Sequence, residues 1–587
     1  MTGVQTCALP ICVAALVDLF KHGKTFGSLI QVPKALGAKL QQLEDAVKQI
    51  MASGDLYAVD TATRLLPLVE QAKVLAGMYD CIVANPPYMG GAGMNVALKD
   101  YAKIYFPDSK SDLFAMFIER GFDWCNTSGL NAMVTMQSWM FLSSYETMRR
   151  KLISNRTIIT MAHLGARAFS EISGEIVQTT TFVLHKAYIN NYRPTFFRLV
   201  DGKEEQKDES LKSKNNRFER TKQDDFTKIS GSPIAYWVSE KVVESFLNGK
   251  ALSAVSEPRK GVTTADNDKY LRNWYEINFN DFETSAISEN GLTSSKKKWF
   301  PVNKGGPYKK WYGNRDIVIE WKNNGQSIKN NESAVIRNST YYFREGMTWN
   351  DISSGKFAMR YTSGDAMFEG KGPMAFAKNK EELLNLIAFM NSKVSTSILA
   401  NLCPTLNYNI GEISKMPINT DILSNSETSV NAQTAITLSK TDWDSFETSW
   451  EFNSIPWLNI PIKSTFTGTS WQNWSKQCSS SFNRMKEIET DNNRYFIDIY
   501  GLGGELDVNV PDDEITLTHC DREADIKRLI SYAIGCMMGR YSLDQPGLVY
   551  ANSGNIGFDP TRYQTFPADD DGIVPVMDMD WFPDDAA

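Results

Sequence analysis

The sequence is short of the residues that build metal sites and membrane spans. Its 587 residues include four histidines and eight cysteines, and no two cysteines are spaced as a Cys-x-x-Cys pair. This composition argues against a zinc site and favours reduced thiols, as in the cytoplasm. No segment approaches the ~20 consecutive apolar residues of a membrane span, and no secretory signal is convincing. We therefore expect a cytoplasmic protein without a metal ion.

Positive charge is also in deficit. The chain has 62 Lys and Arg residues against 69 Asp and Glu residues, which gives a formal net charge of −7 at pH 7. Any surface that binds nucleic acid must therefore be local. The hydrophobic share of 42% and the charged share of 22% are ordinary for a globular protein, and the length predicts several domains.

The two ends of the chain lack the features of natural termini. Residues 1–11 resemble a translated sequencing adapter, and we exclude them from reasoning about the fold as an expected scar. The last residues are acidic and stop at Ala587 without a terminating pattern. From the sequence we expect an internal fragment of a longer protein.

One short stretch organises the first part of the chain. Residues 79–84 form an apolar run that predicts a fully buried strand, and Asn85-Pro86-Pro87-Tyr88 follows directly. Proline cannot continue a central strand, so the chain is expected to leave the sheet in a rigid loop at its carboxyl edge. Ligands of open α/β sheets bind just beyond this edge.

The residues of this loop suit the capture of a planar amino group. The Asn85 Oδ1 atom and the Pro86 carbonyl can accept the two protons of an amine whose lone pair is delocalised into a ring. Tyr88 can hold that ring by stacking, which contributes roughly 1–3 kcal/mol per base. The alternative is a proline-stiffened strand exit with a surface tyrosine. The tetrapeptide resembles motif IV of the adenine-N6 DNA methyltransferases, which implies catalytic roles for Asn85, Pro86, Pro87 and Tyr88.

Strand and helix patterns alternate around this loop. We expect a short strand at 28–32, helices at 40–50, 65–75, 110–121 and 137–150, and strands at 130–136, 158–163 and 177–185. Such alternation predicts an α/β domain with a parallel, doubly wound sheet. The order of these segments resembles motifs V to VIII of the same methyltransferases. The resemblance implies an incomplete Rossmann-like class I methyltransferase domain at residues 12–200.

The same resemblance suggests further pocket residues. It implies that Asp112 and Phe114 shape the pocket between cofactor and base, and that Phe182 or His185 lies near the flipped base. A helix cap and core aromatic residues explain these four positions equally well.

A glycine-rich turn for the methyl donor is missing. S-adenosyl-L-methionine needs such a turn after a buried strand, together with an acidic residue for the ribose. Nothing in residues 12–78 supplies it, and no copy follows later in the chain. We expect that the amino-terminal half of the catalytic domain is absent and that the chain alone is inactive.

The second half of the sequence predicts DNA recognition. After a charged linker at 201–229, residues 260–274 resemble a signature of target-recognition domains, which places an α+β domain at 230–420. Cations then alternate with aromatic residues, as expected of a surface that binds phosphates and stacks bases. The predicted DNA-binding residues are Lys296, Lys297, Lys298, Lys304, Lys309, Lys310, Trp311 and Arg315. A solvated, lysine-rich hairpin is the alternative. Arg337, Arg344 and Arg360 are candidate residues for contacts to base edges.

The remaining segments are read as a linker at 421–470 and a helical region at 471–587. Ile526, Leu529, Ile530 and Ile534 form an apolar stripe that we expect in the core.

Four stretches together carry a resemblance to one family. They are Met89-Gly-Gly, Ser111-Asp-Leu-Phe, Val134-Thr-Met-Gln-Ser-Trp-Met-Phe141 and His163-Leu-Gly-Ala-Arg-Ala-Phe169. From about residue 24 to the end, the chain resembles the PglX family, the adenine methyltransferases of BREX phage-defence systems. The resemblance implies N6-adenine methylation of double-stranded host DNA, with S-adenosyl-L-methionine as donor and other BREX proteins as partners. Three alternatives are a type IIG-like restriction–modification enzyme, a protein-glutamine methyltransferase and a non-catalytic DNA-specificity subunit.

Overall fold

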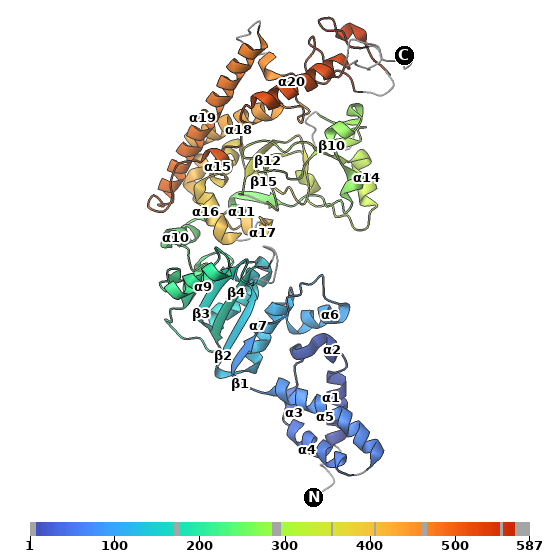
Figure 1. Cartoon of the computed structure of the whole chain (residues 1–587), viewed down its shortest axis with the longest axis vertical. Coiled ribbons are helices and arrows are strands. Elements are labelled where there is room, and N and C mark those ends of the chain that lie inside the picture. The colour runs from blue at the N-terminus through green and yellow to red at the C-terminus, as the bar shows by residue number, and fades with distance from the viewer. Residues whose placement is uncertain are drawn as a thin grey trace. The chain divides into compact units, whose positions relative to one another are not determined.

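The computed structural model describes residues 8–53, 55–169, 177–284, 295–353, 356–403, 407–458, 466–551 and 556–569. The chain forms two compact units, residues 1–238 and 239–587. Each unit has its own helices, strands and core, coloured from blue to green and from green to red in Figure 1. In the described ranges no single helix is long and apolar enough to cross a membrane. Helices α15 (Lys380–Met390) and α16 (Lys393–Leu402) reach the required length and apolar composition only when taken together, and they are bent by 71° relative to each other.

The first unit begins with a small helical bundle. Helices α1 (Ala8–Leu19), α4 (Leu40–Met51) and α5 (Leu56–Ala76) pack through a buried set of aliphatic residues that includes Leu16, Leu43 and Val69. The shorter elements are α2 (Gly23–Phe26), η1 (Gly27–Leu29) and α3 (Lys34–Gly37). The two helices expected from periodicity are confirmed.

The strand expected at 28–32 is wrong. The Arg120 guanidinium donates to the carbonyls of Ser28 at 3.2 Å and of Ile30 at 2.7 Å. Because a side chain takes these carbonyls, the segment forms a 3-10 turn instead of joining a sheet.

A six-stranded sheet follows, in the order β1-β2-β4-β3-β5-β6. The strands are β1 (Tyr79–Ala84), β2 (Cys125–Met136), β3 (Thr157–Gly165), β4 (Thr179–His185), β5 (Thr195–Arg198) and β6 (Arg217–Phe218). β1 pairs with β2 in parallel and β3 with β5 in parallel, whereas β4 runs antiparallel to both β2 and β3. The mixed α/β class is confirmed, and the fully parallel sheet is wrong because β4 returns directly beside β3.

Strand β1 lies at the edge of this sheet. In the described residues it pairs with β2 alone, and the Val83 side chain is 78% exposed. Cys81 and Tyr79, which point to the same face, are exposed as well. The prediction of a fully buried strand is therefore wrong, because the apolar run has neighbours on one edge only.

Two helices cover one face of the sheet. Helix α7 (Leu113–Trp124) packs along β2 (Figure 1). Helix α8 (Glu146–Asn155) packs on β3. The core between them contains Phe114, Met133 and Phe182 among other buried residues. The helix expected at 110–121 is confirmed.

The helix expected at 137–150 is broken into three pieces. Two 3-10 turns, η2 (Gln137–Met140) and η3 (Ser143–Tyr145), precede α8. The buried Arg149 guanidinium donates to the carbonyls of Trp139 and Leu142 at 2.8 and 2.9 Å. These carbonyls are therefore satisfied by a side chain rather than by a helix ladder.

Residues 201–229 belong to the first unit rather than to a linker. They form α9 (Glu204–Ser213), β6 and η4 (Gln223–Lys228), and β6 pairs with β5. The buried Gln223 side chain accepts from Ile158 N at 2.8 Å and donates to the Ile153 and Arg156 carbonyls. The acidic residues of α9 are exposed, whereas Lys207 on the same helix is buried and donates to the Leu164 and Leu199 carbonyls, so buried polar contacts hold the segment.

The second unit is built on small sheets. One has the order β14-β10-β11-β9 and another β13-β12-β15-β8. Their strands are β8 (Ser256–Arg259), β9 (Leu271–Asn273), β10 (Trp299–Asn303), β11 (Ile317–Glu320), β12 (Glu345–Trp349), β13 (Met359–Ser363), β14 (Met367–Phe368) and β15 (Met374–Ala377). β7 (Lys250–Ala251) and β16 (Pro417–Ile418) form a further pair, next to α10 (Glu240–Asn248).

Long helices complete this unit. They are α15 (Lys380–Met390), α16 (Lys393–Leu402), α18 (Ser426–Asp444), α19 (Thr467–Ile499) and α20 (Arg522–Met537). Helix α18 packs against α15 and α19 (Figure 1) and buries Ala432, Ala435 and Ile436. The linker predicted at 421–470 is therefore wrong over α18, whose small apolar face the Ser-rich and Thr-rich composition concealed. The helices predicted after residue 471 are confirmed.

The apolar stripe of α20 does not lie in the core. Ile526, Ile530 and Ile534 are 45%, 53% and 44% exposed. The face that packs inward carries Tyr532 and Cys536 instead, with Leu529 partly buried beside them. The prediction is wrong because this helix is apolar on two faces, and only one of them meets the core.

Candidate functional site

The Asn-Pro-Pro-Tyr loop (residues 85–88) lies at the carboxyl end of β1, as the sequence predicts. Ala84 pairs with Met133 of β2, so the loop begins beside the last residues of that strand. Asn85 and Pro87 are exposed, Pro86 is buried and Tyr88 is half-buried. The buried proline fixes the loop, and the Asn85 amide faces solvent.

Tyr88 is oriented by two weak hydrogen bonds. Its hydroxyl lies 3.3 Å from Asn85 Oδ1 and 3.3 Å from the Val134 carbonyl, and it can donate to either. The ring is therefore held close to the Asn85 amide. Both bonds are long, so moving the hydroxyl away costs little.

Asp112 anchors the chain directly after Tyr88. One carboxylate oxygen, Asp112 Oδ1, accepts from Met89 N at 2.9 Å and from Phe114 N at 3.3 Å. Two backbone bonds add to this contact, from Gly91 N to the Ser111 carbonyl at 3.1 Å and from Leu113 N to the Met89 carbonyl at 3.2 Å. Asp112 thus caps α7 and fixes the loop to its N-terminal end.

Aromatic rings support Tyr88 from inside. The Phe114 ring meets the Tyr88 ring edge to face at 6.0 Å, and Tyr145 packs on Phe114 at 5.9 Å. Phe114 is fully buried, so it can support Tyr88 without reaching a ligand itself. Tyr145 was not found from the sequence, because 57 residues separate it from Tyr88 and nothing local links the two.

Burial shapes the charges near the loop. It raises the pKa of the Asp112 carboxyl, and it raises the pKa of Tyr88 and of Tyr145, with the Asp112 charge adding to both tyrosine shifts. Both phenols are therefore neutral donors at neutral pH. In the described part of the chain, no donor is bonded to the Pro86 carbonyl, which leaves it and Asn85 Oδ1 as acceptors for a ligand.

Phe182 and His185 do not complete the site. Phe182 is buried and meets Trp139 at 5.4 Å in the core. His185 pairs with Leu130, whose other neighbour is Cys81, whereas the loop follows Ala84 three residues further along β1. The His185 ring bonds to the Ala187 carbonyl at 2.9 Å. Because β4 runs antiparallel, it carries His185 away from the loop, and we leave both residues out of the pocket.

The predicted DNA-binding residues divide into two groups. Lys296 is exposed, and Lys297, Lys298 and Lys304 are partly exposed. Lys297 donates to the Asn280 carbonyl, and Lys298 lies 3.9 Å from Glu320 and over the Trp299 ring. These four lysines lie at the surface of the second unit.

The other predicted residues hold the second unit together. Lys309 Nζ contacts Asp442 at 3.3 Å and the Thr516 carbonyl at 2.7 Å. Lys310 is 3% exposed and paired with Glu489, and Trp311 donates to the same carboxylate at 2.8 Å. These three side chains point toward α18 and α19 and not to solvent.

The buried arginines are likewise occupied. Arg315, 4% exposed, pairs with Asp365 at 2.7 Å, and Arg360 donates to Asn350 Oδ1 at 2.8 Å. Burial lowers the pKa of Arg360 to about 10. Like Lys309, Lys310 and Trp311, these two arginines make internal contacts. The prediction that these five residues face DNA is therefore wrong.

The fold brings two further lysines, Lys260 and Lys371, which the sequence did not reveal, near Lys304. Lys260 and Lys371 lie 3.8 and 3.2 Å from one oxygen of the buried Asp351. The charges of these two lysines and of Lys304 also act to lower the pKa of Glu369. The three lysines come from segments far apart in the chain. Asp351 and Glu369 together carry two carboxyl groups against three ammonium groups, so the group keeps an excess of positive charge.

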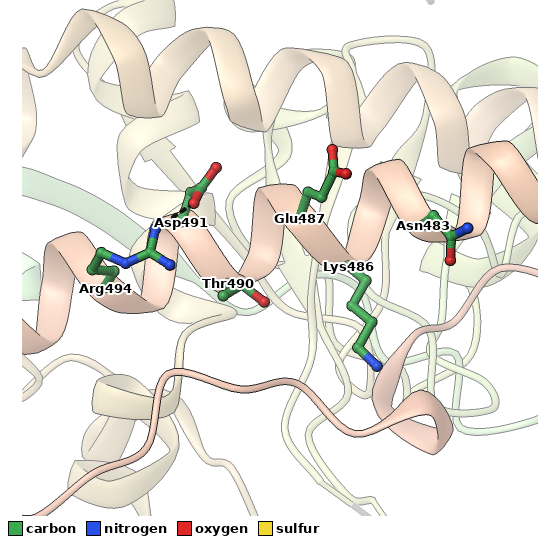
Figure 2. A pocket seen from close by; sticks show the side chains of 6 residues that line it. All are labelled: Asn483, Lys486, Glu487, Thr490, Asp491 and Arg494. Atoms are coloured by element: carbon green, nitrogen blue, oxygen red, sulfur yellow. Dashed lines mark hydrogen bonds and ion pairs between the residues drawn. The ribbon is translucent and has the colours of Figure 1, made fainter.

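A polar hollow on α19 provides a contrast. Figure 2 shows Asn483, Lys486, Glu487, Thr490, Asp491 and Arg494 along one side of the helix. Arg494 is bonded to Asp491 at 2.5 Å, and Lys486 to Asp512 at 2.6 Å. Each cation is already paired, so this hollow offers no excess charge. Among the described residues no group of three or more His, Cys, Asp or Glu side chains could hold a metal ion.

Comparisons with known proteins point to one family. Residues 28–169 match the family model described as Eco57I restriction-modification methylase. The chain is 42% identical over 591 residues to the adenine-specific methyltransferase BrxX of Escherichia coli O9:H4 (strain HS), covering 97% of this chain and 48% of that protein. It is 38% identical over 589 residues to the adenine-specific methyltransferase PglX of Lacticaseibacillus casei (strain Zhang), covering 96% and 48%. The resemblance to PglX that the sequence suggested is thus confirmed.

The chain spans about half the length of the curated relatives it matches. Among solved structures, it is similar to the type IIL restriction-modification enzyme MmeI in complex with DNA, with a TM-score of 0.45, 10% identity and coverage of 90% of this chain and 77% of that chain. A nuclease-deletion mutant of the type ISP enzyme LlaGI, in complex with a DNA substrate mimic, gives a TM-score of 0.41 and 12% identity, covering 68% and 37%.

Proposed function

We propose that this chain carries the base-holding and DNA-recognition parts of a site-specific DNA adenine-N6 methyltransferase that acts in bacterial phage defence. The observation that carries the proposal is the pair of acceptors at the end of β1, Asn85 Oδ1 and the Pro86 carbonyl, beside the ring of Tyr88. The two adenine-specific methyltransferases that match nearly the whole chain support it.

In this proposal the loop holds the amino group of an extruded adenine. The amine donates one proton to Asn85 Oδ1 and the other to the Pro86 carbonyl, which favours a pyramidal, more nucleophilic nitrogen. Tyr88 gives up its long bond to Asn85 and stacks on the base, and Asp112 keeps the loop in place from behind. Stacking of this kind contributes roughly 1–3 kcal/mol, comparable to the cost of flipping a base.

The methyl donor that fits this chemistry is S-adenosyl-L-methionine. In the described ranges no glycine-rich turn follows a buried strand, so these residues alone do not form its pocket. The free edge and exposed face of β1 support the idea that a further part of the longer protein completes the incomplete Rossmann-like class I sheet there. Accordingly, we expect this chain by itself to be inactive.

We assign DNA recognition to the second unit, as an α+β target-recognition domain followed by a helical region. The proposed phosphate contacts are its surface lysines, namely Lys260, Lys296, Lys297, Lys298, Lys304 and Lys371. Phosphate contacts position a protein on DNA without reading its sequence, so base readers are a separate set. Other BREX proteins are proposed partners.

The test replaces Asn85 with Ala in the complete protein and measures N6-methyladenine by modified-base sequencing. We expect methylation to fall by about 10²–10³-fold, as when one positioned hydrogen-bonding group is removed from an active site. Asn95, which caps α6 (Val96–Tyr105), offers a matched control, because Asn95→Ala removes the same side chain ten residues away. Unchanged methylation in Asn85→Ala would exclude the proposed role and favour a non-catalytic specificity subunit.

A second candidate function is the methylase and specificity part of a type IIG-like restriction–modification enzyme. The family model that matches residues 28–169 is described as a restriction-modification methylase, which favours this function. Incubation of the complete protein with unmethylated DNA and Mg²⁺ separates the two functions, because only the restriction enzyme cleaves the DNA.

A further inference from the structure

Two half-buried cysteines meet in the second unit, away from the Asn-Pro-Pro-Tyr loop. Cys478 lies in α19, and Cys520 stands one residue before Asp521, the N-cap of α20. The two side chains are close enough that each shifts the pKa of the other. They are separated by 42 positions in the sequence, so only the fold brings them together.

Contacts on either side fix the two cysteines against each other. One turn beyond Cys478, the Phe482 ring packs on the His519 ring at 4.5 Å. In the other direction along α19, Trp471 Nε1 donates to Asp525 Oδ2 at 2.8 Å. Residues 519–525, which lead into the first turn of α20, therefore run along α19, with the cysteine pair between the Phe482–His519 and Trp471–Asp525 contacts.

A third helix holds this segment from another side. Thr518 N and Thr518 Oγ1 bond to the two carboxylate oxygens of Asp442 in α18, at 3.0 and 3.1 Å. The same Asp442 pairs with Lys309, whose ammonium also bonds to the Thr516 carbonyl. The cysteine pair thus lies at a junction of α18, α19 and α20.

The surroundings distinguish the two sulfurs chemically. The contact with Cys478 lowers the pKa of Cys520, and the Arg528 guanidinium adds to this effect, against burial and the Asp442 carboxylate. The pKa of Cys478 is raised, first by Cys520 and then by burial. These directions favour the thiolate at Cys520 and the thiol at Cys478.

We propose that Cys478 and Cys520 form a peroxide-reactive dithiol that closes into a reversible disulfide between α19 and the start of α20. A partly exposed, activated cysteine beside a second thiol is the arrangement found in redox-sensing proteins. Nothing in the methyl-transfer proposal uses these residues, so this site is independent of it.

The chemistry needs hydrogen peroxide, or another hydroperoxide, as the two-electron oxidant. The Cys520 thiolate attacks one peroxide oxygen, the O–O bond breaks, and the hydroxide that leaves takes a proton to give water. Cys478 then attacks the sulfur of the Cys520 sulfenic acid, releasing its proton and expelling hydroxide as a second water. The two thiols are oxidised to one disulfide, and the peroxide is reduced to two water molecules.

The disulfide would staple the helical junction. It would tie α19 to the segment that accepts the Lys309 bond, close to the internal contacts of Lys310 and Trp311. Closing a loop of this length restricts the unfolded chain, so oxidation is expected to raise Tm by roughly 5–10 °C.

The test uses the purified chain, treated with a small molar excess of hydrogen peroxide, blocked with N-ethylmaleimide and mapped by mass spectrometry. We expect a peptide pair that joins Cys478 to Cys520, lighter by two hydrogens, which dithiothreitol separates again. Cys81, exposed on β1, is the internal control. Cys520 is expected to react at least about tenfold faster than Cys81 at pH 7.

Two variants assign the roles. In Cys478→Ser the sulfenic acid of Cys520 should persist and be trapped by dimedone, whereas in Cys520→Ser neither the cross-link nor the adduct should form. A cross-link that is absent from the oxidised chain would overturn the proposal. So would a Cys520 that reacts no faster than Cys81, or a dimedone adduct on Cys478 in place of Cys520.

Discussion

The buried contact between Lys310 and Glu489 predicts a large loss of stability when one partner is removed. Lys310 and Glu489 are 3% and 5% exposed, and Trp311 donates to the second oxygen of the same carboxylate at 2.8 Å. Glu489→Ala leaves a buried ammonium without its partner, which costs about 3–5 kcal/mol. It also leaves the indole N–H unsatisfied, which adds about 1–3 kcal/mol.

The assay is thermal unfolding of the purified chain, followed by tryptophan fluorescence. With an unfolding entropy of about 2.1 cal/mol/K per residue, 1 kcal/mol shifts the Tm of a unit as long as residues 239–587 by about 1.4 °C. We therefore expect the transition of the second unit to fall by about 6 °C or more. Glu489→Gln keeps the acceptor for Trp311 but removes the charge. Combined with Lys310→Met, it should recover most of the loss, because both charges are then gone.

A matched control lies on the same helix. Glu487 pairs with Arg484 at 3.2 Å, and both side chains are more than half exposed. Glu487→Ala should therefore cost less than about 1 kcal/mol. If Glu489→Ala behaved like Glu487→Ala, Lys310 would not be a structural residue, and its original interpretation as a DNA contact would have to be restored.

Three further predictions follow from buried and exposed side chains. Burial lowers the pKa of His163 from its usual 6.5 to about 3, so the unfolded chain takes up a proton first as the pH falls below 6.5, and stability declines. Between pH 7 and pH 4, the free energy of unfolding of His163→Gln should fall by up to about 3 kcal/mol less than that of the wild type, as measured from Tm. Equal acid sensitivity of the two proteins would contradict this. Asp112→Ala removes the acceptor of Met89 N and Phe114 N and should cost about 1–2 kcal/mol, with faster hydrogen exchange at Met89, whereas Asp112→Asn should retain the cap. Protection unchanged in Asp112→Ala would refute the anchoring role. Ile530→Ser on α20 should shift stability by less than about 0.5 kcal/mol, since the side chain is 53% exposed, and a larger loss would return the stripe to the core.

Local chemistry in the sequence predicts the candidate site well. Proline cannot continue a central strand, so Pro86 and Pro87 mark the end of β1, and aspartate is a preferred N-cap, so Asp112 marks the start of α7. The strand end and the helix start could therefore be placed from neighbouring residues alone. The structure confirms the strand, the loop and the cap. It also places Asn85 in solvent and not in the apolar interior.

Long-range contacts explain what the sequence could not predict. A lysine beside a tryptophan is compatible with a DNA surface or with a buried ion pair, and the choice at Lys310 depends on Glu489, 179 residues away. The direction of β4 depends on which strand it pairs with, and its own residues favour a strand of either orientation. The interior stripe expected on α20 fails for a similar reason, because periodicity shows that a helix has an apolar face but not what covers it.

The outermost strand also governs how the chain behaves when it is concentrated. β1 presents unpaired amide and carbonyl groups along one side and an uncovered Val83 on its surface. A bare strand of this kind is a template for pairing with another molecule. The exposed Asp80, where the register between β1 and β2 shifts, is a charged residue of this strand. Purified alone, the chain is expected to self-associate through this strand, and a lysine in place of Val83 is the simplest change that would keep it monomeric for crystallisation.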